Sequence, residues 1–213
     1  RIHDAGETQE NIGIDTAAGL GDSAFLDNVT VEVGDENTSL VIGNKIDEDN
    51  TVSTNNSLNA SALDFSATAE EGNSIAIKDE SSKLVLGGSG DGELVTVNGE
   101  AAAEKVSINV EAGTLVLGSD LSSGANQSLS AVVTIGSDNG NTSGTLKVNT
   151  GNQTVNGTIE NKATGTIAVN KDAALTAKEV ENKGTLSVAG DAVITKLTGE
   201  ANSTITVGDS SSA

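Results

Sequence analysis

The side chains best suited to chemistry in this chain are carboxylates in glycine-rich and asparagine-rich stretches. The stretch "GGSGDGELV" (87–95) approaches the calcium-binding nonapeptide G-G-x-G-x-D-x-U-x, but Asp91 comes one position early and the stretch has no second copy. In "KIDEDNTV" (45–52), Asp47 and Asp49 alternate with Thr51, where an EF-hand loop would need glycine at Val52. We therefore take Asp47, Asp49 and Asp91 as candidate Ca²⁺ ligands, with a solvated acidic surface as the alternative.

Other reaction chemistry has less support. His3 is the only histidine and there is no cysteine, so neither a histidine-based triad nor a thiol nucleophile is indicated. Parallel β-helices that cleave sugars use paired carboxylates together with Arg, Lys or aromatic platforms, whereas the aromatic residues here are Phe25 and Phe65. We expect a protein that is not an enzyme and needs no cofactor other than the candidate Ca²⁺, with a glycosidase or lyase as the alternative.

Composition limits both the core and the partners. The 213 residues carry a net charge of −20, contain 25 glycines, and lack Cys, Pro, Met, Trp and Tyr. A core without large side chains must be built from many small aliphatic contacts, which suits a long, thin core. Residues 1–100 hold 20 acidic against 4 basic residues, and residues 101–213 hold 11 against 7. Such a surface repels phosphate, which argues against nucleic acid and anionic membrane as partners. No run approaches the roughly 18 apolar residues of a membrane span, so we expect no direct membrane insertion.

One phrase, [T/S/K]-[L/I]-x-[V/I/L], recurs along the chain. Successive copies start 44, 31, 31, 21, 19 and 19 residues apart, and the first step is wide enough for two coils or one long insertion. A second short alternating run precedes several copies, as at Thr30–Val33, Ser74–Ile77 and Lys105–Ile108. The copies begin at Ser39, Lys83, Thr114, Thr145, Thr166, Thr185 and Thr204.

This period predicts an all-β fold, a single-stranded parallel β-helix (β-solenoid) with coils of about 19–31 residues and loop excursions in the N-terminal half. A β-sandwich is the alternative, but it does not require near-identical phrases at fixed spacing. Alternation within each phrase places its second and fourth residues inside. The inward set is Leu40, Ile42, Leu84, Leu86, Leu115, Leu117, Leu146, Val148, Ile167, Val169, Leu186, Val188, Ile205 and Val207.

The predicted organisation has three parts: an N-terminal lead-in or cap at 1–27, the β-solenoid at 28–208, and a Ser-rich tail at 209–213. Residues 44–73 form the clearest loop excursion, and residues 1–25 and 44–73 carry disorder as an alternative. Within these excursions, "SALDFSATAEE" (61–71) and "EAAAEK" (100–105) are expected to form short helices, and "SDNGNTSG" (137–144) a projecting hairpin tip. Because the chain begins with Arg1 rather than Met, we expect a mature or excised piece of a longer protein.

The segment Gly144–Gly208, with its "GTL-x-V" and "G-x-I-x-N" phrases, its many Asn, Gly and Thr residues and its lack of Cys, resembles the passenger region of bacterial autotransporters. The resemblance covers Val29–Gly118 more loosely. It implies a right-handed parallel β-helix, export through the Gram-negative envelope, and an extracellular role at the bacterial cell surface in adhesion or autoaggregation. The partner would be a receptor on a host or neighbouring cell, or the chain itself. The alternative is a self-assembling structural subunit of an extracellular filament or surface layer.

Overall fold

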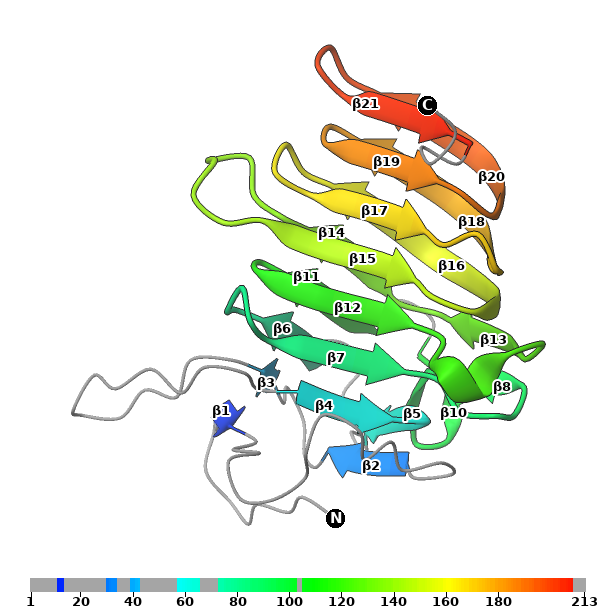
Figure 1. The fold of residues 1–213 in the computed structure, drawn as a ribbon. Coiled ribbons are helices and arrows are strands. Elements are labelled where there is room, and N and C mark those ends of the chain that lie inside the picture. The colour runs from blue at the N-terminus through cyan, green and yellow to red at the C-terminus, as the bar shows by residue number, and fades with distance from the viewer. Residues whose placement is uncertain are drawn as a thin grey trace.

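The described part of the chain is all-β, and its strands form three mostly parallel sheets (Figure 1). The structure is a computed structural model that describes residues 11–13, 30–33, 39–42, 57–65, 73–102 and 105–208. Within these residues the only helical element is a 3₁₀ turn, η1 (Asp120–Ser122).

A seven-stranded parallel sheet is built from the recurring phrase. Thr114, Thr145, Thr166, Thr185 and Thr204 follow one another as register partners, so the 31-, 21- and 19-residue steps of the sequence are steps from one strand to the next. In sheet order the strands are β21 (Thr204–Val207), β19 (Thr185–Val188), β17 (Thr166–Val169), β15 (Gly144–Val148), β12 (Gly113–Leu117), β7 (Lys83–Leu86) and β4 (Ser57–Ala60).

The first copy of the phrase does not belong to this sheet. Ser39–Ile42 forms β3 in a different sheet, where it pairs with β6. The strand that lies next to β7 at this end of the seven-stranded sheet is instead β4, whose Ser57 is the register partner of Lys83. The wide 44-residue step therefore contains a further strand of the seven-stranded sheet.

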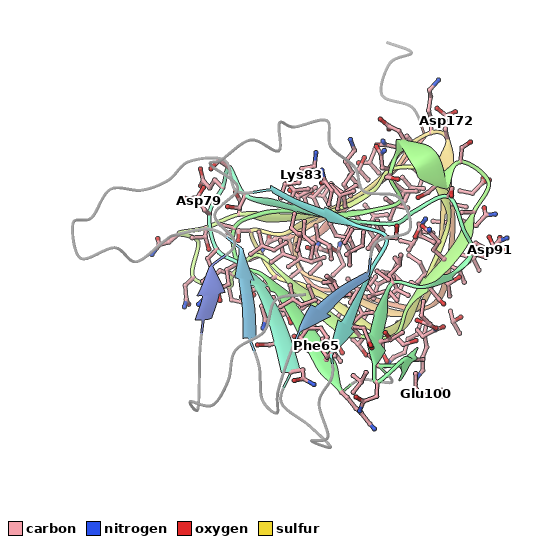
Figure 2. The ribbon with its side chains drawn as sticks, turned by 90° about the horizontal axis from the view of Figure 1, so that it is seen from below. Phe65, Asp79, Lys83, Asp91, Glu100 and Asp172 are labelled. Atoms are coloured by element: carbon pink, nitrogen blue, oxygen red, sulfur yellow. The ribbon has the colours of Figure 1, made fainter. Side chains whose placement is uncertain are left out.

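The second, ten-stranded sheet curls around the other side of the core (Figure 2). Two short strands, β13 and β14, follow each other around the curve, whereas later in the chain one long strand spans it. This is seen in β16, which pairs with β13 through Asn152–Val155 and with β14 through Ile159–Asn161. The strands are β1 (Asn11–Gly13), β3 (Ser39–Ile42), β6 (Asn73–Ile77), β8 (Gly92–Glu93), β11 (Val106–Val110), β13 (Asn126–Leu129), β14 (Val132–Ile135), β16 (Gly151–Asn161), β18 (Ala173–Asn182) and β20 (Asp191–Gly199).

The third sheet replaces both predicted helices with strands. It holds β2 (Thr30–Val33), β5 (Ala62–Phe65), β9 (Val95–Val97) and, antiparallel to β9, β10 (Glu100–Ala101). The helix expected at 61–71 is wrong for its described part because Leu63 and Phe65, two positions apart, are both fully buried, which suits a strand. The helix expected at 100–105 is also wrong at its start, where Glu100 and Ala101 pair with β9.

Two predicted loops are also changed by the structure. Residues 57–65, inside the excursion expected at 44–73, form β4 and β5, and both strands are paired. Residues 137–144 project from the molecule as expected (Figure 1), but they connect β14 to β15, which lie in different sheets. This projection is therefore a loop between sheets and not a hairpin tip.

The core consists of columns of Leu, Ile and Val between the sheets. Leu84, Leu115, Leu146 and Ile167 are fully buried register partners, and Leu186 follows them at 1% exposure. Leu86, Leu117, Val148, Val169 and Val188 form a second buried column. Ile205 and Val207 continue the two columns as register partners of Leu186 and Val188, but they are 47% and 79% exposed because no strand lies beyond β21 in the described residues. The side chains of Leu40 and Ile42 lie outside what the structure describes.

Glycines allow close approach where the chain enters the seven-stranded sheet. A Cβ built on Gly144 would lie 2.0 Å from the Val110 carbonyl oxygen, and one on Gly184 would lie 2.2 Å from the Gly165 carbonyl oxygen. Gly144 and Gly184 are needed for space and not for an unusual backbone conformation. Of Gly113, Gly144 and Gly184, which stand at the entrance to their strands, only Gly113 has a positive φ, of +78°.

Candidate functional site

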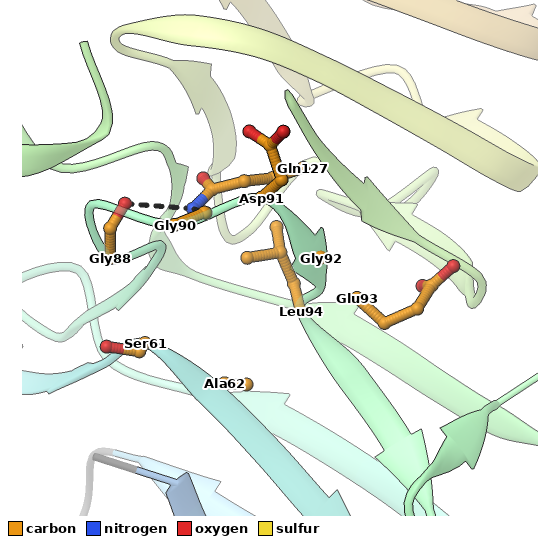
Figure 3. A pocket seen from close by; sticks show the side chains of 9 residues that line it. All are labelled: Ser61, Ala62, Gly88, Gly90, Asp91, Gly92, Glu93, Leu94 and Gln127. Carbon is orange, nitrogen blue, oxygen red and sulfur yellow. Dashed lines mark hydrogen bonds between the residues drawn. The ribbon is translucent and has the colours of Figure 1, made fainter. Parts of the chain in front are cut away.

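A hollow in the described part of the chain lies beside the loop between β7 and β8. Its volume is about 260 Å³ (Figure 3). The lining comes from this loop, from β8 and the residue after it, from the start of β5 with the residue before it, and from β13. The lining residues are Ser61, Ala62, Gly88, Gly90, Asp91, Gly92, Glu93, Leu94 and Gln127.

A buried glutamine holds this loop in place. The Gln127 side-chain amide donates hydrogen bonds to the carbonyl oxygens of Gly88 and Gly90, both at 2.9 Å. Its own oxygen accepts from Gln153 Nε2 at 3.1 Å, one strand further along the sheet. Ser122 Oγ also donates to the Gly88 carbonyl, at 2.9 Å. The loop is thus fixed by the side chains of Ser122 and Gln127, which satisfy backbone carbonyls that the sheets leave unpaired.

The two carboxylates of the hollow are held apart. Asp91 accepts the Asn126 backbone N–H at 2.6 Å, while Glu93 accepts the hydroxyls of Ser128 at 2.8 Å and Ser130 at 3.3 Å. Figure 3 shows the two carboxylates well separated and pointing in different directions. Each carboxylate therefore has a structural role in joining β8 and its loop to β13 and the residue that follows it, and no basic or aromatic side chain lines the hollow beside them.

Asp91 is an exposed residue in this arrangement. The described residues contain no group of three or more His, Cys, Asp or Glu side chains placed to hold a metal ion. Asp47 and Asp49, like His3, lie outside the described residues. Of the three candidate calcium ligands only Asp91 is therefore described, and calcium binding stays a prediction.

A second buried amide pair lies at the far side of the molecule. Asn161 Nδ2 donates to Asn182 Oδ1 at 2.6 Å and to the Thr185 carbonyl oxygen at 3.0 Å. Both side chains are almost completely buried at the ends of β16 and β18, where the chain turns into the seven-stranded sheet. Asn161 therefore ties the end of β16 to the end of β18 and to the start of β19.

Our reading of the sequence missed these amide contacts, although a signal for them is present. "NQSL" (126–129) and "NQTV" (152–155) repeat the Asn-Gln pair that stacks, and "ENK" occurs at both 160–162 and 181–183. When the same polar residue recurs at the spacing of the repeated phrase, at a position that alternation places inside, it indicates buried side chains that hydrogen-bond from one strand to the next.

Lysines on the outer surface connect segments that are far apart in the sequence. Lys183 Nζ lies 3.5 Å from Asp138 Oδ2 in the projecting loop and 3.4 Å from Glu200 Oε1 at the next corner. Asp138 first, and then Glu200, raise the pKa of Lys183 above its ordinary value. The hydrogen bond to Glu179 likewise raises the pKa of Lys196. These ion pairs hold neighbouring parts of the surface together.

No helix among the described residues is both long enough and apolar enough to cross a membrane. Comparison with protein-family models, with curated proteins and with solved structures finds no match to this chain.

Proposed function

We propose that the chain forms an extracellular, non-enzymatic β-solenoid that acts by surface contact, in adhesion or autoaggregation at a bacterial cell surface. In this proposal the three sheets are faces of a single-stranded parallel β-helix with coils of about 19–31 residues. The partner is a receptor on a host or neighbouring cell, or another copy of the chain. The passenger-like phrases of residues 144–208 support this surface role.

The observation that carries the proposal is the register of the seven-stranded sheet. Each parallel pair joins residues one period apart in the sequence, so the same alternation repeats on every strand. Leu, Ile and Val fill the core, while Thr114, Thr145, Thr166 and Thr185 face outward and are half-buried. This arrangement supports an extended, flat polar face that is suited to contact with another large surface.

The hollow beside β8 supports contact rather than catalysis. Asp91 and Glu93 are occupied by hydrogen bonds from Asn126, Ser128 and Ser130. A glycosidase needs two carboxylates that flank one bond, and these two point apart. We expect no turnover when the purified chain is incubated with acidic polysaccharides, and release of reducing ends or unsaturated sugars would contradict this part of the proposal.

The contact role is tested by displaying the chain on a bacterium that does not clump. We expect faster sedimentation than with an unrelated passenger of similar size. Thr145→Lys with Thr185→Lys, on the seven-stranded face, should slow clumping, whereas Thr134→Lys with Thr176→Lys, on the ten-stranded face, should not. Circular dichroism of the purified variants checks that all of them fold. No clumping above the control passenger would overturn the proposal, and equal loss in both variant pairs would overturn the assignment to this face.

A second candidate function is the self-assembling subunit of an extracellular filament or surface layer. The edge formed by β20 and β21 favours it, because each of these strands pairs on one side only within the described residues. Fibres or sheets seen by negative-stain electron microscopy of the purified chain would support this candidate, and discrete small particles would contradict it.

A further inference from the structure

Three Asn-Gly pairs occur in the chain, at Asn98–Gly99, Asn139–Gly140 and Asn156–Gly157. In such a pair the backbone nitrogen of the glycine can attack the side-chain amide carbon of the asparagine before it, because glycine has no Cβ to shield its nitrogen. The attack needs an N–H that can lose its proton and a backbone that can turn until the nitrogen faces the side chain. The three pairs lie in three different settings, and the settings differ in both requirements.

The first pair is held in the tight turn between β9 and β10. It forms a two-residue hairpin turn, with a φ of 52° at Asn98 and 77° at Gly99. The Gly99 N–H donates to Asp64 Oδ1 at 2.9 Å. The Asn98 N–H donates to the Phe65 carbonyl oxygen, also at 2.9 Å. These bonds fix the backbone, and the negative charge of the Asp64 carboxylate opposes loss of the Gly99 proton.

The pair Asn156–Gly157 lies within the long strand β16. Asn156 Nδ2 donates to Ser130 Oγ at 3.1 Å, which holds the side chain against the neighbouring segment. A Cβ built on Gly157 would lie 2.0 Å from the Ala131 carbonyl oxygen, so the backbone here is packed closely on one side. Because an extended strand keeps the following nitrogen turned away from the side chain, and this one has no room to rotate, the attack is blocked.

The pair Asn139–Gly140 meets both requirements. It lies in the projecting loop between β14 and β15 (Figure 1), and both residues are exposed. A Cβ built on Gly140 would meet nothing within 4 Å. In the described part of the chain, neither the Asn139 side-chain amide nor the Gly140 N–H has a hydrogen-bond partner. The Gly140 proton is therefore open to water, and the backbone around it has space to turn.

We propose that Asn139 is a modification site, at which the folded chain converts its own asparagine to an acid. The Gly140 nitrogen gives its proton to water or hydroxide and forms a bond to Asn139 Cγ, and Nδ2 leaves as ammonia. Water then opens the resulting imide ring at one of two bonds of that nitrogen. Breaking the bond to Cγ gives aspartate, and breaking the bond to the backbone carbonyl carbon gives isoaspartate. The net reaction consumes water, releases ammonia and changes no oxidation state.

The conversion changes the charge of a surface loop. Asp138 is the one charged residue of 137–144, so a new carboxylate at position 139 doubles the negative charge of this loop. Asp138 is also the residue through which the loop contacts Lys183, at 3.5 Å. The loop therefore becomes more acidic beside this ion pair as the chain ages. The inference rests on the settings of the three pairs and does not depend on adhesion.

The test compares the three pairs within one sample. Trypsin cleaves after lysine, which places the pairs in three separate peptides, 84–105, 106–147 and 148–162. The full chain is incubated in warm, mildly alkaline buffer, either folded or in urea, and is then unfolded and digested. Fragmentation mass spectrometry of each peptide identifies which asparagine has gained the mass of an amide that became an acid.

We expect Asn139 to convert in the folded chain, and Asn98 and Asn156 to convert more slowly by a factor above about ten, because they react only after local opening. In urea all three should convert at similar rates. Asn139→Gln should abolish the reaction in the loop, since a longer side chain would have to close a less favoured ring. Asp64→Ala, which frees the Gly99 N–H, should speed conversion of Asn98 and leave that of Asn139 unchanged.

Three results would overturn the assignment. An unchanged Asn139 in the folded chain, with conversion of the same residue in urea, would show that the loop holds the pair in an unreactive conformation. Equal rates at the three pairs in the folded chain would show that their settings give no protection. Faster conversion of Asn98 or Asn156 than of Asn139 would place the modification site elsewhere.

Discussion

β19 and β21 carry the same phrase and have opposite environments. Thr185–Val188 and Thr204–Val207 are parallel register partners along their whole length. Leu186 is 1% exposed and Ile205 47%, and Val188 is 5% exposed and Val207 79%. The difference comes from the neighbouring strands, because in the part of the chain that the structure describes β19 lies between two strands of its sheet and β21 beside one. The phrase therefore determines that the segment is a strand and which side chains face inward, whereas their burial is determined by the strands on either side.

The largest expected effect of this difference is on stability when a core side chain is shortened. Leu186→Ala leaves a cavity in the core between the sheets and should lower the free energy of unfolding by about 2–5 kcal/mol. Ile205→Ala removes a side chain that is already half exposed and should lower it by about 1 kcal/mol. Urea unfolding of both variants, at protein concentrations where the chain is single, measures the contrast. Equal losses would mean that the last coil is packed as tightly as the interior ones.

A glycine at the entrance to β19 gives the next contrast. A Cβ on Gly184 would lie 2.2 Å from the Gly165 carbonyl oxygen and 2.5 Å from that of Lys162, and backbone atoms cannot rotate away. We expect Gly184→Ala to lower the free energy of unfolding by about 3 kcal/mol. Gly90→Ala is the control, since a Cβ there meets nothing within 4 Å. A Gly184→Ala variant as stable as Gly90→Ala would show that the backbone before β19 can move away from the backbone before β17 at little cost.

The position before β21 that corresponds to Gly184 does not require glycine. There Ser203 precedes the strand, and the connection from β20 to β21 is longer than the one from β18 to β19. It turns through Asn202, whose φ is 97°. The restriction to glycine thus applies where one corner is stacked tightly on another.

A third, smaller contrast concerns the amide at the end of β18. Asn182→Ala removes the buried acceptor of Asn161 Nδ2 and should lower the free energy of unfolding by about 2 kcal/mol. Asn170→Ala removes a comparable amide contact, to Asn149 Oδ1 at 2.9 Å, but at a half-buried site where water can replace it. We expect about 1 kcal/mol there. Hydrogen exchange of β17 and β19 amides should rise more in Asn182→Ala, and the opposite order would contradict the role of burial.

The sequence predicted the strands of the seven-stranded sheet well because one alternation repeats at one spacing. It misplaced Ser39–Ile42 because any strand with one buried face shows the same alternation, and the phrase does not specify a sheet. It could not show that Ile205 would be exposed, since that depends on what lies beyond the strand. At the candidate site it identified Asp91 but not Gln127 and Gln153, because polar residues were treated as outward when some of them form buried ladders.

The smallest expected effect is an alkaline loss of stability at the corner between β18 and β19. Asp138 and Glu200 raise the pKa of Lys183 above its ordinary value of 10.5. A raised folded-state pKa means that this contribution is fully present below pH 10.5 and is lost as the pH rises through the higher folded value. The effect should be slight and should shrink with salt, because the side chains are exposed to screening.

Lys183→Met should therefore flatten the dependence of the urea midpoint on pH above 10.5 in low salt, and leave the shape below pH 9 unchanged. Lys171→Met is the matched control, since its amine lies 3.7 Å from Asp172, its neighbour in sequence, and joins no separate coils. If Lys171→Met flattens the profile as much as Lys183→Met does, the loss at high pH reflects overall negative charge rather than this corner. If only Lys183→Met does so, the ion pairs link the projecting loop to the connection between β20 and β21. The stability of these last two strands then depends on contacts made outside the core.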